Sequence, residues 1–213
     1  MSYVQMKMTF EVSSSIHSTG DRLAFWIDKP TALDSSAGQR PILTASSVKG
    51  LLRATAESLL RRQGKIVCIG PRPEQLCADP MTSCVICRHF GSPRVKSPLR
   101  FFEACLDGDV RRDTRMNVGI ERRRRVAKED HLFSVEVSQA RSLIAEVSGL
   151  YSQEESAKEA IGLLYLAAKA IFALGGGRSR GLGHVDLSRY DAQLDGMEQS
   201  LNEVMEAVLE ILG

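Results

Sequence analysis

The sequence lacks the long apolar runs and the nucleotide-binding signatures that mark several common classes of protein. No stretch of about 18 consecutive apolar residues occurs, which excludes a transmembrane helix. The glycine-rich segment Leu174–Val185 fits neither the G-x-x-x-x-G-K-S/T phosphate loop nor a dinucleotide fingerprint after a strand, so a nucleotide cofactor is poorly supported. Met1–Val12 alternates in polarity and does not resemble a signal peptide, so we expect a cytoplasmic protein.

Positive charge is absent from the C-terminal end of the chain. From Tyr190 onward there are six acidic residues and no lysine or arginine. The first 189 residues carry 28 basic and 20 acidic side chains, a formal charge of +8, although the whole chain has only +2. A basic body favours a polyanionic partner, most often nucleic acid. A solvated surface without a partner is the alternative.

Two periodicities divide most of the chain into strands and helices. Strands are predicted over residues 4–12, 99–106, 133–137, 141–150 and 184–190, with a short one around 23–27. Helices are predicted over residues 46–64 and 152–175, and an acidic amphipathic helix over 191–213. This order predicts a single α+β domain of residues 1–213, built on a ferredoxin-like or RNA-recognition-motif βαββαβ sheet with two large insertions.

Local signals indicate where the two central helices begin and end. Ser46 or Ser47 can cap the first helix, and Gly64 can end it. Ser152 and Glu155 form a capping box at the start of the second helix.

Four of the five cysteines crowd into twenty residues, and disulfides are rare in cytosolic proteins. Four soft ligands without a redox motif favour a structural, tetrahedral Zn²⁺. The insertion of residues 66–98 holds five of the seven prolines and little apolar content, so a metal would stabilise it directly. His89 is an alternative to the first cysteine as a ligand, and four free thiols in a loop are the other alternative. The fifth, Cys105, fits a buried position in a strand. The predicted ligands are Cys68, Cys77, Cys84 and Cys87.

The second insertion, residues 107–131, is dominated by arginine. Seven arginines lie between Arg111 and Arg125, four of them consecutive. Because the run lies between two strand signals, it predicts a protruding β-hairpin whose basic flanks can hold phosphates. A solvated, charged hairpin without a ligand is the alternative.

The segment Leu174–Val185 contains five glycines and two arginines directly after a long apolar helix. Successive glycines let backbone N–H groups converge on an anion, and Arg178 and Arg180 add charge that does not titrate. A sugar-phosphate backbone fits such a cradle. The alternative is a tight helix stop packed on the sheet, with both arginines in solvent.

Four of these segments together resemble the RAMP superfamily of CRISPR proteins. GGGRSRGLGHV is similar to its glycine-rich signature, and PILTASSVKGLLR to its Ser-Ser-x-Lys-Gly helix start. CVICRHFGSP resembles its C-x-x-C-x-x-F-G zinc segment, and NVGIERRRRVAKEDHLFSVE its hairpin. The matches occur in the family's order, from about His17 to Val185. Departures include Thr44–Ala45 in place of Pro-Gly, Glu121 in place of the hairpin aspartate, and His184 in the glycine loop.

Within that superfamily the chain looks most like the repeated backbone subunit of type III effector complexes. The resemblance implies a modified RNA-recognition-motif fold that polymerises with further copies and other subunits along a guide CRISPR RNA. It also implies a hairpin, or thumb, that displaces one nucleotide of the guide–target duplex at regular intervals.

The resemblance also implies site residues. In WIDKP, Asp28 matches the loop aspartate with which the family cleaves complementary target RNA. By its own chemistry, Asp28 could hold Mg²⁺ or another divalent cation or orient the 2′-hydroxyl, and its neighbours Asp21 and Asp34 could share this role. Without the resemblance, Asp28 would be read as a solvated loop carboxylate. RNA contacts are implied for His17, Ser47, Lys49, Arg53, Arg122, Arg123, Gly175, Gly176, Gly177, Arg178, Arg180 and Gly181. A structural subunit that does not cut RNA, and a metal-independent RNA-processing enzyme that uses His17, are the alternatives.

Overall fold

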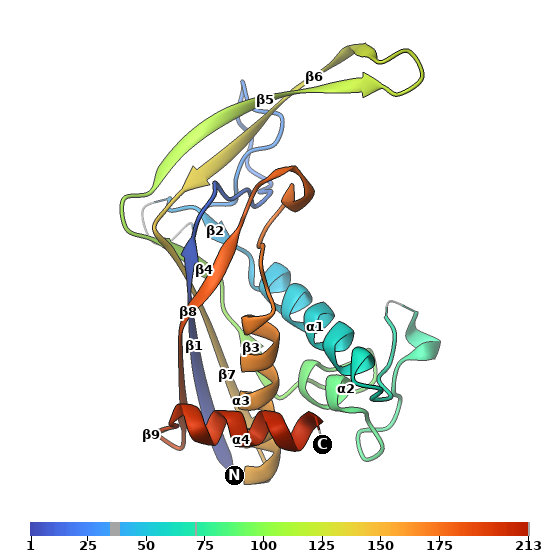
Figure 1. Ribbon diagram of the computed structural model, residues 1–213, viewed down its shortest axis with the longest axis vertical. Coiled ribbons are helices and arrows are strands. Elements are labelled where there is room, and N and C mark those ends of the chain that lie inside the picture. The colour runs from blue at the N-terminus through green and yellow to red at the C-terminus, as the bar shows by residue number, and fades with distance from the viewer. Residues whose placement is uncertain (35–38, 71, 213) are drawn as a thin grey trace.

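A large antiparallel sheet, covered on one face by helices, forms the body of the protein, and a long two-stranded hairpin extends from one end of it (Figure 1). The computed structural model describes residues 1–34, 39–70 and 72–212. All pairings between its named strands are antiparallel. The predicted mixture of helices and an antiparallel sheet is therefore confirmed.

The large sheet contains β1 (Ser2–Val12), β2 (Ile42–Leu43), β3 (Leu99–Phe101), β4 (Ala104–Asp107), β7 (Ser142–Tyr151), β8 (Val185–Leu194) and β9 (Met197–Glu198). The hairpin consists of β5 (Arg111–Glu121) and β6 (Val126–Gln139). The helices are α1 (Ala45–Arg62), α2 (Val85–Phe90), α3 (Glu154–Lys169) and α4 (Leu201–Leu212), with short 3₁₀ turns at Pro73–Gln75 and Arg178–Arg180.

The strand order of the sheet is β2-β4-β7-β1-β8-β9, and β3 also pairs with β7. Strand β1 thus lies between β7 and β8, where Met6 is opposite Val147 on one side and Ala192 on the other. Its alternating sequence buries every second side chain against α1 and α3, and each such side chain contributes about 2 kcal/mol by leaving water. The buried apolar side chains of β1 are Val4, Met6, Met8 and Phe10.

The ends of the central helices differ in part from the sequence prediction. Thr44 caps α1, because its hydroxyl accepts a hydrogen bond from the Ser47 N–H at 3.4 Å, whereas Ser46 and Ser47 already lie within the helix. Gly64 follows the helix with φ +77°, as predicted for a glycine stop. The capping box is wrong: Gln153 precedes α3, and its side chain makes no capping hydrogen bond.

The predicted strand over residues 99–106 is interrupted at Phe102, so β3 and β4 pair separately with β7. Cys105 points away from the core and is exposed, contrary to expectation. No strand forms over residues 23–27. The hairpin is longer than residues 107–131, because pairing between β5 and β6 continues to Arg111 and Gln139.

The acidic C-terminal helix begins at Leu201, not at residue 191, because β8 continues its pairing with β1 as far as Leu194. The apolar face of α4 packs on α3. There, a side chain added at Gly162 would lie 2.9 Å from the backbone of Ala207. The acidic segment therefore folds against its own chain. No helix in the described ranges is both long and apolar enough to cross a membrane.

Candidate nucleic-acid interface

Two segments from the N-terminal part of the chain lie along the edge of β6 at the base of the hairpin. Ile16 exchanges backbone hydrogen bonds of 2.8 and 2.7 Å with Ser138. Further along the same edge, Lys29 N–H donates to the Ser134 carbonyl and Glu136 N–H donates to the Lys29 carbonyl, both at 3.0 Å. This backbone pairing brings Asp28 and His17 to the base of the hairpin, although both are more than 100 residues away in sequence.

Asp28 is exposed, but its carboxylate is fixed. Its Oδ2 accepts hydrogen bonds from the Ser134 backbone N–H at 2.7 Å and from the Ser134 hydroxyl at 2.8 Å. These two bonds, the backbone one first, lower the pKa of Asp28 below its ordinary value, so the group is ionised at neutral pH. Both hydrogen bonds from Ser134 end on Oδ2, and no other described residue donates to Oδ1, which can therefore meet a cation or a hydroxyl group.

Glu136, which sequence reasoning missed, holds the loop that carries Asp28. Its buried carboxylate accepts a hydrogen bond from the Arg22 guanidinium and another, of 2.8 Å, from the Thr31 N–H. Arg112 on β5 lies 3.7 Å from the other carboxylate oxygen. The alternation of Val135 with Val137 places Glu136 on the opposite face of the strand, where the sequence alone suggests solvent. The loop covers that face instead.

His17 lies beneath the glycine loop, with only 5% of its surface exposed. Its Nδ1 lies 2.7 Å from the Glu136 carbonyl oxygen, which can only accept, so Nδ1 carries a proton. Its Nε2 lies 2.9 Å from the Thr19 hydroxyl. The His17 carbonyl accepts a 2.7 Å hydrogen bond from Gly176 N–H. The histidine thus supports the loop, and both of its ring nitrogens are engaged.

The glycine-rich segment requires its glycines for two physical reasons. Gly175, Gly177, Gly181 and Gly183 all have positive φ angles. In addition, a side chain at Gly183 would collide with the backbone carbonyl of Leu174. The segment therefore packs tightly on the end of the sheet, as the helix-stop alternative requires.

The same geometry exposes the arginines. Arg178, Ser179 and Arg180 form an exposed 3₁₀ turn between the left-handed Gly177 and Gly181. Several amides are used internally: those of Gly176, Arg180 and Gly183 donate within the protein. In the described residues, the N–H groups of Gly175, Gly177, Arg178 and Ser179 have no protein acceptor. Part of the predicted set of converging amides is therefore free, and the two guanidinium groups add positive charge beside it.

The turn itself and Phe172 line a hollow of about 690 Å³, and two further hollows lie between the turn and neighbouring elements. One, of about 160 Å³, lies between it and the base of the hairpin and is lined by His17, Lys29, Arg115, Asn117, Gly176 and Arg180, among others. The other, of about 430 Å³, lies between the turn and α1 and is lined by Ser47, Gly50, Gly175, Gly176 and Arg178, among others. These hollows thus bring together several residues for which the resemblance implied RNA contacts: His17, Ser47, Gly175, Gly176, Gly177, Arg178 and Arg180.

Lys49 and Arg53 lie further along α1, outside both hollows. The Lys49 ammonium is 5.7 Å from the centre of the Phe101 ring, and burial, followed by the charge of Arg53, lowers its pKa. Arg53 donates to Glu57 and to the Gly91 carbonyl, each at 2.8 Å. Arg53 thus connects α1 to the cysteine-bearing insertion, a structural role that the sequence did not indicate.

Arg122 and Arg123 lie in the exposed turn between β5 and β6, at the tip of the hairpin in Figure 1. They are therefore separated from the Asp28 site by about half the length of the hairpin, because Ser134 pairs with Met116 in the middle of β5. Any RNA contact that they make is distinct from the contacts of the glycine loop.

The four cysteines of the insertion converge. The sulfur atoms of Cys68, Cys77, Cys84 and Cys87 all lie within 4.8 Å of one another. A tetrahedral Zn²⁺ with Zn–S bonds of about 2.3 Å places its sulfur ligands about 3.8 Å apart, so these thiols fit such an ion with small adjustments. Burial raises the pKa of Cys68 strongly, and the neighbouring Cys77 adds to the shift. A bound cation would reverse this penalty, because it favours the thiolate.

His89 does not join the cysteines. It is fully buried, and its two ring nitrogens lie 2.9 Å from the Tyr151 hydroxyl and 2.9 Å from the Glu159 carboxylate. The side chain therefore connects α2 to β7 and α3, and the structure gathers the four thiols without it.

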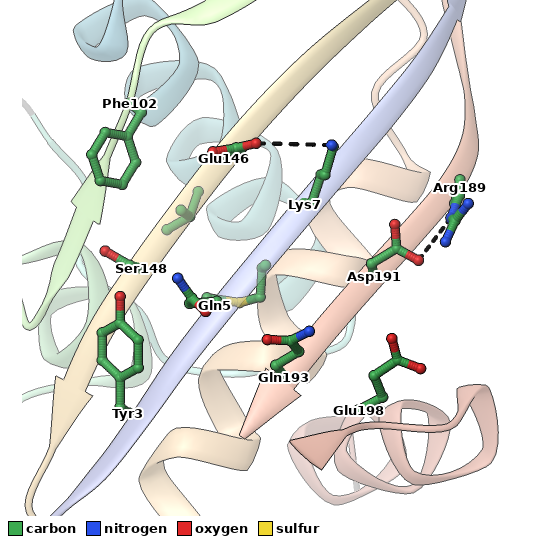
Figure 2. Close-up of a pocket in the computed structure, with 12 residues that line it drawn as sticks. Tyr3, Gln5, Lys7, Phe102, Glu146, Ser148, Arg189, Asp191, Gln193 and Glu198 are labelled. Atoms are coloured by element: carbon green, nitrogen blue, oxygen red, sulfur yellow. Dashed lines mark hydrogen bonds and ion pairs between the residues drawn. The ribbon is translucent and has the colours of Figure 1, made fainter. Parts of the chain in front are cut away.

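The other face of the large sheet carries a separate, shallow pocket of about 370 Å³ (Figure 2). Its two basic groups are paired, Lys7 with Glu146 at 4.0 Å and Arg189 with Asp191 at 2.8 Å. Glu198 adds a further acid at the rim. Because its cations are neutralised, this pocket offers little to a phosphate and is not part of the candidate interface.

Comparisons with known proteins identify a shared fold and a family. The chain has the fold of a protein in the "Cryo-EM structure of the Type III-B Cmr-beta bound to cognate target RNA", with a TM-score of 0.62 and 13% sequence identity. The match covers 89% of this chain and 60% of the other, so this chain spans less than two thirds of that protein. No curated protein matches the sequence. The model of the RAMP superfamily matches residues 30–186, most of the chain, and the protein therefore belongs to that superfamily.

Proposed function

We propose that the chain is the repeated backbone subunit of a type III CRISPR effector complex, which binds guide RNA and cuts complementary target RNA. One observation carries the proposal: Asp28 is fixed, ionised, at the base of a basic hairpin and near an arginine-bearing glycine loop. Membership in the RAMP superfamily, and the shared fold with a protein from a type III-B complex bound to target RNA, support it. Its partners would be further copies and other subunits along one RNA.

The strand order supports a ferredoxin-like assignment. Taking β1, α1, β4, β7, α3 and β8 as the repeating framework gives βαββαβ, with a spatial order β4-β7-β1-β8. The cysteine-bearing insertion and the hairpin then interrupt this framework on either side of β4.

Guide RNA would lie across the end of the sheet. Ser47 and Arg178 line the hollow beside α1, while Lys29 and Arg180 line the one beside the hairpin. A strand that follows both hollows meets cations at each, and the exposed arginines can hold successive phosphates. Lys49, beside Phe101, lies next to this path.

Cleavage would take place at Asp28. When a nucleotide is displaced from the duplex, its 2′-oxygen can move into line with the adjacent phosphorus. Attack forms the 2′-O–P bond and breaks the bond to the 5′-oxygen, while the 2′-hydroxyl proton passes to solvent and the leaving 5′-oxygen takes a proton from solvent. The free Oδ1 of Asp28 would orient this hydroxyl, while Ser134 keeps the carboxylate in place. Mg²⁺, which one or two carboxylates plus substrate phosphates commonly hold, would supply charge neutralisation at the phosphate, with Asp28 as its protein ligand.

The cysteine-bearing insertion would hold a structural Zn²⁺. The described part of this insertion, residues 66–70 and 72–98, contains only one short helix and one 3₁₀ turn, so the four thiols would be its main internal connection once metal is bound. Arg53 and His89 then fix the insertion to α1 and α3.

A second candidate is a structural subunit that binds RNA without cutting it. The contact of Asp28 with Ser134 favours this candidate, since it gives the carboxylate a structural purpose of its own. The third candidate, metal-independent processing by His17, has less support, because both nitrogens of that ring are engaged in a buried site.

The test uses the assembled complex, loaded with guide RNA and supplied with target RNA and Mg²⁺. Asp28→Asn keeps the shape of the side chain and removes its charge, and Asp130→Asn, on the distal part of the hairpin, is the matched control. We expect regularly spaced cuts with wild type and control, and none with Asp28→Asn. If the wild-type complex binds target RNA normally but leaves it uncut, the second candidate, a structural subunit, is supported. Cutting of precursor guide RNA in EDTA would support processing.

A further inference from the structure

Three large apolar side chains project into solvent just before Asp28. Leu23, Phe25 and Trp26 are 101%, 100% and 91% exposed. Large apolar groups gathered on a surface mark a place where another molecule binds. They belong to the loop that rises along the hairpin in Figure 1, between the N-terminal strand and α1.

The backbone that carries these rings is anchored. The Ser134 hydroxyl lies 3.2 Å from the Trp26 carbonyl oxygen, and Ile27 N–H donates to the Ala24 carbonyl at 3.3 Å, which closes a turn. Ser134 is also the residue that fixes the Asp28 carboxylate. The same serine therefore sets the position of the Trp26 backbone relative to the acid.

The hairpin adds further apolar side chains next to Asp28. Met116 is paired with Ser134, and Val118 with Leu132, two positions further toward the tip. Residues two apart on a strand share a face, so these three apolar side chains lie on the face that Ser134 turns toward Asp28. All three are exposed. The carboxylate is thus close to both an aromatic loop and an apolar strip on the hairpin.

The charge around this surface favours RNA over a protein as the occupant. Residues 111–131 contain eight lysines and arginines and four acidic residues, and Lys29 follows Asp28 directly. A single RNA strand offers both features at once, flat apolar base faces and phosphates. Aromatic rings stack on such bases, and apolar side chains act as wedges between them.

We propose that Trp26 and Phe25 stack on the target-RNA bases that flank the displaced nucleotide, and so hold the scissile 2′-hydroxyl at Asp28. This inference rests on the proposed function. The two aromatics are positioning residues, because they touch the strand next to the reacting atoms without taking part in the bond changes. Stacking does not depend on base identity, which suits a subunit that must act on any target sequence.

The test places 2-aminopurine, whose emission falls when it stacks, at the target nucleotides on either side of each displaced position. In the guide-loaded complex, we expect weak emission with wild type and emission several-fold stronger with Trp26→Leu, which remains apolar but cannot stack. Trp26→Tyr should restore the weak emission. Target affinity should fall at least about fivefold with Trp26→Leu, the loss of one stacked base. Tyr3→Leu, an exposed aromatic on the opposite sheet face, is the matched control.

A second measurement uses the full chain alone, because Trp26 is its only tryptophan. Single-stranded RNA should quench the emission of Trp26 and protect it from acrylamide. If RNA binds without quenching Trp26 and without protecting it from acrylamide, the inference is overturned. Equal 2-aminopurine emission in wild type and Trp26→Leu would overturn it as well. Either result would leave the proposed function standing. Protection of Trp26 on assembly with other subunits before target is added would also overturn it, in favour of a protein contact. Absence of RNA binding by the complex would refute the proposed function itself.

Discussion

Asp28 and Ser134 are 106 residues apart in sequence, yet two hydrogen bonds of 2.7 and 2.8 Å join the carboxylate of one to the N–H and hydroxyl of the other. This contact attaches the loop that carries the candidate catalytic group to the base of the hairpin. Movement of the hairpin on RNA would therefore move the carboxylate with it. Loop and hairpin act as one unit in the proposed mechanism.

The first prediction concerns the ionisation of Asp28. Its pKa is lowered in the folded protein, so the contact stabilises the fold above the ordinary value of about 3.9 and loses this effect as pH falls through the lowered value. Ser134→Ala should raise the pKa only in part, because the backbone N–H, the larger cause, remains. Carboxyl ¹³C NMR titration of Asp28 measures both values. A wild-type value at or above the ordinary one would contradict the assignment.

The second prediction concerns the buried carboxylate of Glu136. Glu136→Gln leaves the Arg22 guanidinium without its charged partner and should destabilise the fold by about 2 kcal/mol, less than for a fully buried pair because Arg22 is partly exposed. Urea denaturation measures the change in the free energy of unfolding. A protease should also cut the loop near Arg22 sooner in this variant than in the wild type. Glu129→Gln, on the exposed part of the hairpin, should change neither. Equal stability of the two variants would show that contacts other than those of Glu136 hold the loop in place.

Glu136 also shows where the sequence stops being informative. The alternation of Val135 and Val137 correctly predicts a strand with one apolar face, but it assigns Glu136 to solvent. Only the pairing of Lys29 with this strand, across more than 100 residues, reveals that a loop covers the other face. Asp28 could be singled out only through the family resemblance, because an isolated loop aspartate has no periodicity that marks it.

Sequence spacing was a more reliable guide where the residues of a site lie close together in the chain. Thiol spacing predicted that four cysteines meet, and they do, whereas His89 is drawn into the core by Tyr151 and Glu159, which no spacing could show. In the same way, Arg53 resembles an RNA-facing residue of its helix until its partner, the Gly91 carbonyl, is known.

The third prediction separates two glycines of the same loop. Both Gly183 and Gly181 have positive φ, but a side chain at Gly183 meets the Leu174 carbonyl, whereas one at Gly181 meets open space. Gly181→Ala should therefore cost only the conformational penalty, about 1 kcal/mol. Gly183→Ala should cost at least twice as much, because backbone must also shift. Urea denaturation distinguishes the two, and equal losses would show that the Leu174 contact is unimportant.

The fourth prediction concerns the cysteines. Elemental analysis should find about one zinc per chain, and Cys84→Ser should lower the metal content and the midpoint of thermal unfolding together, because binding stabilises the insertion. Cys105→Ser, exposed and outside the cluster, should leave both unchanged. Metal-free protein with unchanged stability would refute the zinc assignment.

The last prediction concerns the salt dependence of RNA binding, which reports how many phosphates the protein neutralises. For single strands each neutralised phosphate contributes about −0.7 to the slope of log K against log salt concentration. Arg178→Gln with Arg180→Gln should therefore make the slope shallower by about 1.4, since both guanidinium groups are exposed beside the hollows. Arg189→Gln removes an arginine that already pairs with Asp191 on the opposite face, and should leave the slope unchanged. If the double variant weakens binding but keeps the wild-type slope, the arginines act by shaping the loop and not by contacting phosphates, and the RNA path must be sought elsewhere on the basic body.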